Sequence, residues 1–294
     1  RGHNLEGRSP SGRSTLRVAI LTVMEPAGVH LAVPRGLLPV GGFTIARHQL
    51  TVAIALECQR VIVFARDFSP GMVDLQHHAE KAGLHFHVIS GARPLSGLVS
   101  AHDELFVFSD GLLAAPQEAE QLLGQGPCVL VQPVEQGMAA GFERIDINHA
   151  TAGAMRVPGR LAERLAELPG DCDVASALTR IALQAGIRQE PLPLALRDSP
   201  GWRLIRDEAE AHMAEAGWIR LHLGDVAASA PGPLLAQAAI RRFGPGLLHA
   251  GSGSRAILLA AGGLLLVAIV GSWYGHPVAG FVLPQFVRHD DHLS

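Results

Sequence analysis

The sequence predicts an α/β protein with a mainly parallel sheet sandwiched by helices, followed by a C-terminal transmembrane helix. Between residues 16 and 196, short apolar runs alternate with segments of helical periodicity, a pattern typical of parallel strands joined by helices. Residues 256–274 (AILLAAGGLLLVAIVGSWY) form an apolar run close to the ~20 residues that cross a bilayer. The composition, 48% hydrophobic and 17% charged over 294 residues, suits a globular body with a more apolar appendage.

The first elements are the clearest. Leu16–Val23 and Arg60–Ala65 are continuous apolar runs of the kind that form strands buried on both faces. Thr44 is placed to cap a helix that continues to about Cys58. Further along we expect strands at Leu84–Ile89, Leu105–Phe108, Cys128–Gln132 and Glu143–Asn148, and helices at Met72–Ala82, Leu161–Leu168, Val174–Ala185 and Trp202–Ala216. The alternation predicts right-handed connections that cover both faces of the sheet.

Two motifs resemble a known family. Leu38-Pro39-Val40-Gly41-Gly42 after the first strand, and the segment 103–112 (DELFVFSDGL), resemble the corresponding parts of sugar-nucleotide and alditol-phosphate nucleotidyltransferases. The resemblance implies a nucleotidyltransferase-like domain over residues 16–196, with Arg35 and Asp110 as catalytic residues. It also implies Mg²⁺ as the cofactor of an active enzyme, since metal ions stabilise charge on a transferred phosphate.

A second resemblance concerns the order of segments. The α/β domain, a Trp-containing helix with Glu208-Ala209-Glu210, a basic segment and a membrane helix resemble the cytidylyltransferase half of bifunctional inositol-phosphate cytidylyltransferase/CDP-alcohol phosphotransferase fusions. This order implies CTP or a CDP-alcohol as ligand. The Asp-Gly-x-x-Ala-Arg motif of the phosphotransferase half does not occur in the sequence, so phosphotransferase chemistry is not expected.

The expected phosphate loop departs from the family pattern. Residues 24–30 (MEPAGVH) contain one glycine, Gly28, together with a proline that lacks an N–H group and a glutamate that repels phosphate. Gly28, Gly41 and Gly42 are the candidate nucleotide-binding glycines, and Arg35 is the remaining cation near the loop. The loop is therefore degenerate, and the sequence leaves open whether the domain is active.

Each candidate site residue also has a structural interpretation. Asp110 ends a strand at the carboxyl edge, where α/β proteins bind ligands and metals, but Asp-Gly is equally a turn pair. Gly41 and Gly42 fit either a nucleotide or a tight turn. Asp173 offers a second carboxylate for a metal, yet its place before an apolar helix favours a helix cap.

Composition and flanking charges bear on location and partners. The net charge of −3 gives no indication of a nucleic-acid partner, and the widely spaced cysteines suit a reduced compartment. Arg241, Arg242 and Arg255 precede the apolar run and only Arg288 follows it, which predicts a single-pass protein of the cytoplasmic (inner) membrane with its soluble domain in the cytoplasm. The predicted divisions are a disordered leader 1–15, the α/β domain 16–196, an amphipathic helical extension 197–226, a linker and juxtamembrane segment 227–255, the transmembrane helix 256–274 and an interfacial tail 275–294.

Two functional hypotheses follow. In the first, the domain is a degenerate nucleotidyltransferase-like protein that is tethered to membrane lipid. It serves as a binding or scaffold subunit for a lipid-synthesis membrane protein in lipid headgroup or CDP-alcohol metabolism. In the second, it is an active Mg²⁺-dependent cytidylyltransferase that makes a CDP-activated alcohol phosphate for membrane lipid synthesis.

Overall fold

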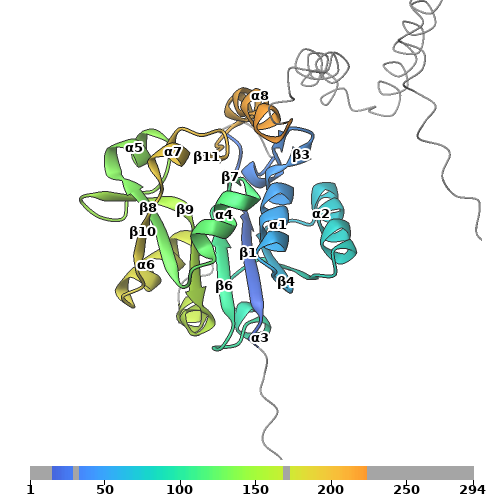
Figure 1. Ribbon diagram of the computed structural model, residues 1–294. Helices are drawn as coiled ribbons and strands as arrows, with labels where there is room; N and C mark the ends of the chain where they lie inside the picture. The colour runs from blue at the N-terminus through green and yellow to red at the C-terminus, as the bar shows by residue number, and fades with distance from the viewer. Residues whose placement is uncertain (1–14, 29–32, 168–172, 224–294) are drawn as a thin grey trace, which may run out of the picture. The chain divides into compact units, whose positions relative to one another are not determined.

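A seven-stranded sheet organises the part of the chain that the computed structural model describes, residues 15–28, 33–167 and 173–223 (Figure 1). The strand order is β10-β8-β9-β6-β1-β4-β5. Only β9 runs antiparallel to its neighbours, β6 and β8, so the predicted mainly parallel sheet is confirmed. The strands are β1 (Arg17–Val23), β4 (Arg60–Ala65), β5 (His85–Ile89), β6 (Glu104–Phe108), β8 (Cys128–Pro133), β9 (His149–Pro158) and β10 (Gln189–Pro191).

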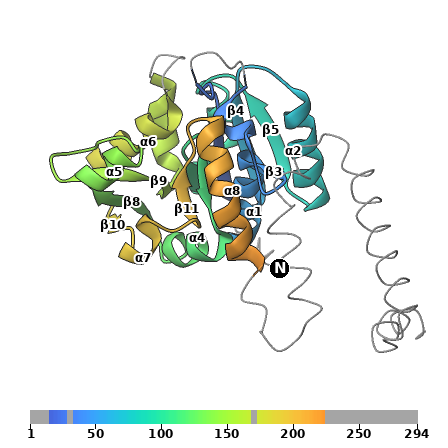
Figure 2. The same cartoon turned by 90° about the horizontal axis from the view of Figure 1, so that it is seen from above.

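Helices cover both faces of this sheet (Figure 2). Strand β1 explains why: Ala19 and Leu21 join the apolar cluster on one face, whereas Val18 and Ile20 join the cluster on the other. Both sets of side chains are buried, so the strand is apolar without a break over residues 18–21. The first face is covered by α1 (Ile45–Ala55), α2 (Pro70–Lys81) and α4 (Pro116–Leu123), and the second by α3 (Leu95–Leu98), the 3-10 helix η2 (Gly159–Glu167) and α6 (Val174–Gln184).

Smaller elements complete the described residues. They include two antiparallel pairs, β2 with β3 and β7 with β11, which lie outside the central sheet. Thr44, at the end of β3, accepts a hydrogen bond from the Arg47 amide and caps α1 as predicted. The elements are η1 (Arg35–Leu37), β2 (Pro39–Val40), β3 (Phe43–Thr44), β7 (Leu112–Ala114), α5 (Val134–Ala139), α7 (Leu194–Arg197), β11 (Trp202–Leu204) and α8 (Glu208–Leu223).

The prediction of a strand at Glu143–Asn148 is wrong. That segment is a loop in which Asp146 accepts hydrogen bonds at 2.7 Å from the amides of Asn148 and His149. Such side-chain bonds to nearby backbone compete with strand pairing. The strand starts only at His149, as β9, and continues to Pro158.

Two expected helices also differ. The segment from Leu161 forms part of the 3-10 helix η2. The expected helix Trp202–Ala216 is divided into β11 and a later helix, α8. Trp202 is fully buried and donates from Nε1 to the Ala152 carbonyl at 2.9 Å, so its ring belongs to the core. Residues 202–223 therefore pack against the same body as the sheet.

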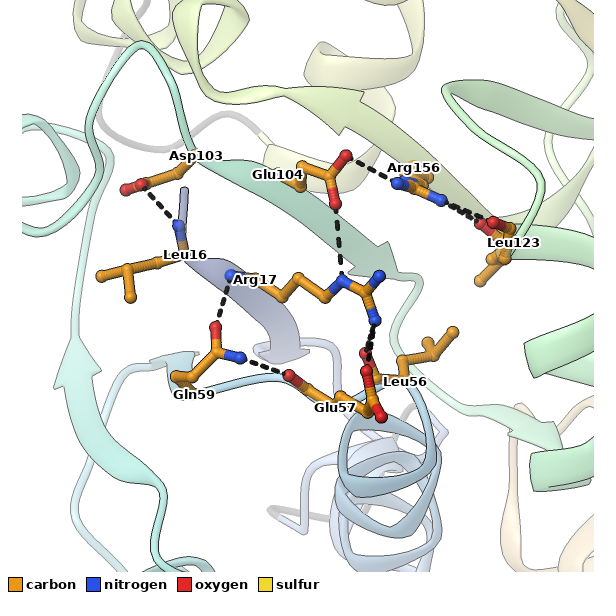
Figure 3. A network of polar contacts seen from close by, with 10 residues as sticks. Leu16, Arg17, Leu56, Glu57, Gln59, Asp103, Glu104, Leu123 and Arg156 are labelled. Carbon is orange, nitrogen blue, oxygen red and sulfur yellow. Dashed lines mark hydrogen bonds and ion pairs between the residues drawn. The ribbon is translucent and has the colours of Figure 1, made fainter. Parts of the chain in front are cut away.

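A polar network ties the amino edge of the sheet together (Figure 3). Glu104, at the start of β6, contacts Arg156 of β9 at 2.6 Å and Arg17 of β1 at 3.5 Å. The buried Arg156 also donates to the carbonyls of Leu123 and Gly124 at the C-terminal end of α4. The network links three neighbouring strands to a covering helix and lies at the edge opposite the carboxyl ends of the parallel strands.

The predicted membrane helix at residues 256–274 lies outside the described residues, as do most of the leader, the linker and the C-terminal tail. Within the described ranges, every helix is too short or too polar to cross a bilayer. The membrane helix and the predicted membrane location thus stay predictions.

Candidate functional site

The loop after β1 is held at both ends by backbone hydrogen bonds. Ala27 donates to the carbonyl of Val33 and Arg35 donates to that of Glu25, each at 2.8 Å. Gly28 has a φ of +98°, a conformation that glycine adopts without the steric cost of a side chain. Gly28 therefore shapes the loop, and its nucleotide-binding role stays a prediction.

The carboxylate of Asp110 closes this loop against the end of β6. Its Oδ2 accepts hydrogen bonds from the amides of Met24 at 2.7 Å and Glu25 at 2.8 Å. Its Oδ1 is buried and has no hydrogen-bond partner among the described residues. Burial raises the pKa of Asp110 to about 7, although the two amides and the charge of Arg35 act in the opposite direction. Asp110 thus links two loops across the carboxyl edge of the sheet.

The turn that carries Asp110 is itself supported by α1. Gln49 is buried and donates from Nε2 to the carbonyls of Ser109 at 3.0 Å and Leu112 at 2.9 Å. Gly111 has a φ of +80°, and a Cβ there would stand 2.2 Å from the carbonyl oxygen of Ile205. These contacts fix the backbone on both sides of Asp110.

Arg35 begins η1, beside the same loop. Its terminal nitrogen Nη1 lies 3.1 Å from Glu25 Oε2, so the carboxylate of the loop offsets the guanidinium charge. Gly36 follows, and a Cβ there would be 3.3 Å from Asp110 Oδ1. A side chain at this position would therefore crowd the buried carboxyl group.

Gly41 and Gly42 form the turn between β2 and β3, with φ values of +59° and +87°. Positive φ at both central residues is the geometry of a tight hairpin turn. The Gly41 amide donates to Glu215 of α8 at 3.2 Å, and Trp218 packs over the same glycine. The turn is thus covered by α8, and a nucleotide-binding role for the two glycines stays a prediction.

Asp173 is the cap of α6. Its side chain accepts hydrogen bonds from the amides of Ala175 at 3.3 Å and Ser176 at 3.1 Å. It also contacts the Ser176 hydroxyl, which in turn contacts Glu143. The capping interpretation of Asp173 accordingly matches its contacts, while its role as a metal ligand stays a prediction.

A cavity of about 850 Å³ brings three of the predicted residues together. Arg35, Asp110 and Asp173 all line it, whereas Gly28, Gly41 and Gly42 do not. A smaller cavity of about 150 Å³ is also lined by Asp110 and Asp173. The candidate site is therefore centred on the carboxyl ends of β1 and β6, where ligands bind in α/β sheets.

Several residues that line the larger cavity were not predicted from the sequence. Glu143 pairs with Arg180 at 2.9 Å, and Arg164 donates to Gln184 at 3.2 Å. Spacing along α6 places position 180 one turn after Ser176, but Glu143 and Arg164 come from distant segments and carry no local signal. The cavity wall is consequently rich in charged side chains that already have partners within the protein.

The arrangement at Asp110 does not fit a bound Mg²⁺ ion. Such an ion prefers six oxygen ligands at about 2.0–2.1 Å and keeps several waters. Oδ2 is engaged with two amides and Oδ1 is inaccessible, so neither oxygen has room for a hydrated ion. No cluster of three or more His, Cys, Asp or Glu side chains suited to a metal occurs within the described ranges. Mg²⁺ binding thus requires the Asp110 side chain to leave its present contacts.

Comparison with solved structures reveals the fold type. A UDP-glucose pyrophosphorylase from Acinetobacter baumannii superposes with a TM-score of 0.50 and 10% sequence identity, over 77% of this chain and 99% of the other. The fold is of the nucleotidyltransferase type. A UDP-glucose pyrophosphorylase solved with UDP-glucose gives a TM-score of 0.49 and 11% identity, over 70% of this chain and 99% of the other. No family model and no curated protein matches the sequence. At such low sequence identity, the similarity to these solved structures concerns the fold alone.

Proposed function

We propose that this chain is a non-catalytic, ligand-binding protein with a nucleotidyltransferase-type fold. Tethered to the cytoplasmic membrane by residues 256–274, it serves as a binding or scaffold subunit in lipid headgroup or CDP-alcohol metabolism. The membrane and lipid parts of this proposal rest on the sequence order and its resemblance to the cytidylyltransferase fusions. The non-catalytic part rests on the contacts of one side chain.

The observation that carries the proposal is the pair of hydrogen bonds to Asp110 Oδ2. Backbone N–H groups of a loop after a strand are the donors that cradle phosphate in nucleotide sites. Here the amides of Met24 and Glu25 donate to Asp110 instead. A phosphate cannot use these donors while the carboxylate holds them, and the Glu25 side chain pairs with Arg35, the nearby cation.

Substitution of Asp110 distinguishes the proposal from an active enzyme. Calorimetric titration of the full chain in lipid nanodiscs with millimolar CTP, with and without Mg²⁺, gives the affinity. If Asp110 competes with phosphate, Asp110→Ala keeps or increases CTP affinity, because two amides become available. If Asp110 is a metal ligand, Asp110→Ala abolishes Mg²⁺-dependent binding. That loss, or Mg²⁺-dependent pyrophosphate release from CTP above the Asp110→Ala background, would overturn the non-catalytic proposal.

The alternative, an active cytidylyltransferase, is favoured by one specific observation. Asp110 and Arg35 line the same cavity, and Asp110 Oδ1 has no partner among the described residues. A rotation of the carboxylate that releases Met24 and Glu25 would present both oxygens and both amides to a ligand. Measured turnover of CTP with an alcohol phosphate would decide for this alternative.

A further inference from the structure

Helix α8 packs directly on the hairpin formed by β2 and β3 (Figure 1). Trp218 is 5% exposed, and its ring meets the His48 ring edge-on at a centroid distance of 4.8 Å. A Cβ on Gly41 would lie 3.0 Å from Trp218 Cδ1. Glu215 is 1% exposed and accepts the hydrogen bond from the Gly41 amide. An aromatic ring and a buried carboxylate thus hold α8 to one turn.

The same helix shares an apolar cluster with the segments that carry the candidate site. Ala27 brings in the loop after β1, Leu38 the residue after η1, and Leu113 the strand that follows Asp110. Just before α8, the Ile205 amide donates to the Gly111 carbonyl at 2.9 Å. The complete cluster consists of Ala27, Leu38, Val40, Ile45, Leu113, Ala115, Ile205, Ala211, Ala214 and Trp218.

We propose that docking of α8 controls the order of the cavity wall that carries Arg35 and Asp110, and thereby ligand affinity. Displacement of α8 removes Trp218 from the cluster and loosens the loop after β1 and the Asp110 turn together, because both contact the cluster. Binding then has to reorder these segments and weakens. The effect on affinity rests on the proposed binding function, whereas the effect on order does not.

Hydrogen exchange of the full chain in nanodiscs tests the effect on order. Trp218→Ala is expected to accelerate exchange at least ~10-fold in peptides covering residues 24–28 and 110–113, because local opening becomes easier. The matched control is Met213→Ala on the same helix, whose side chain is 69% exposed; it should leave these peptides unchanged. Peptides over β5, at the far edge of the sheet, report global unfolding and should also stay unchanged.

Acceleration confined to α8 and residues 38–44, with residues 24–28 and 110–113 unaffected, would overturn the proposal. If Trp218→Ala also accelerates hydrogen exchange in β5, the same peptides are compared in Trp218→Phe, which retains a ring, and its exchange pattern decides. CTP titration separates the effect of α8 on ligand affinity from its effect on the order of the cavity wall. A wild-type chain that does not bind CTP refutes the nucleotide-binding function, while the exchange pattern still decides the coupling. A wild-type chain that binds should lose about fivefold or more in affinity with Trp218→Ala, and equal affinities would refute regulation of the site.

Discussion

Asp110→Asn is expected to flatten the pH dependence of stability between about pH 4 and pH 7. Burial raises the pKa of Asp110 from 3.8 to about 7 in the folded protein. Between these values the unfolded chain has lost a proton that the folded chain keeps, so the free energy of unfolding falls as the pH rises. The stability contributed by the protonated carboxyl is fully present below pH 4 and is lost by about pH 7.

The size of this effect follows from the same two pKa values. Each pH unit across the window corresponds to about 1.4 kcal/mol, so the wild-type chain loses at most about 4 kcal/mol relative to Asp110→Asn. The amide oxygen of asparagine can still accept from Met24 and Glu25, which keeps the loop contacts. Asp110→Ala leaves both amides without their acceptor and should be about 1–3 kcal/mol less stable than Asp110→Asn at every pH.

Urea unfolding of the full chain in detergent, followed by circular dichroism at half-unit steps from pH 4.5 to 8, measures both effects. The relevant quantity is the difference in unfolding free energy between wild type and Asp110→Asn, since other titrating groups cancel in it. The difference should shift in favour of asparagine as the pH rises. A constant difference would show that folding leaves the pKa of Asp110 unchanged, and a shift in favour of aspartate would show that the folded protein stabilises the charged carboxylate. Either result would refute the reasoning.

Two further substitutions test the packing of the site and of the opposite edge. In urea unfolding, Gly111→Ala should destabilise the protein by at least ~1–2 kcal/mol more than Gly83→Ala. Both glycines have a φ of +80°, but only a Cβ on Gly111 would meet backbone, at 2.2 Å. Equal losses would contradict the close approach of the Ile205 carbonyl to Gly111. Glu104→Gln should lower the free energy of unfolding by about 1–3 kcal/mol, because it weakens the ion pair of the buried Arg156. The Glu57 side chain is 79% exposed, so Glu57→Gln should change the free energy of unfolding by no more than about 0.5 kcal/mol. Similar losses for both variants would contradict a role for burial.

The central strands could be predicted from the sequence because burial on both faces leaves a local trace. β1 and β4 are apolar at nearly every position, and their bounds agree with the predicted ones within a residue. β9 carries no such trace: it begins with His149 and the small residues 150–154 (ATAGA), and it contains the charged Arg156. Its place between β6 and β8 depends on pairing with strands far away in sequence, which local patterns do not encode.

The division of Trp202–Ala216 into β11 and α8 has the same origin. Trp202 pairs with Ala114, which is far away in the sequence, and its indole finds an acceptor at Ala152. A local helical pattern gives no information about either partner. The sequence nevertheless located the caps well, since Thr44 and Asp173 bond to amides two or three residues away.

For the candidate site, the sequence identified residues but could not determine where their polar atoms point. Asp110 at the end of a strand is compatible with a metal ligand and with a turn, and the deciding contacts come from Met24 and Glu25, far away in the chain. The degenerate loop and the buried carboxylate are physically connected. A loop that carries Glu25 and lacks additional glycines attracts phosphate poorly, and its free amides then need another acceptor, which Asp110 supplies. Restoring glycines in the loop while keeping Asp110 should therefore leave the CTP affinity in calorimetric titration unchanged, because the carboxylate still occupies the two amides.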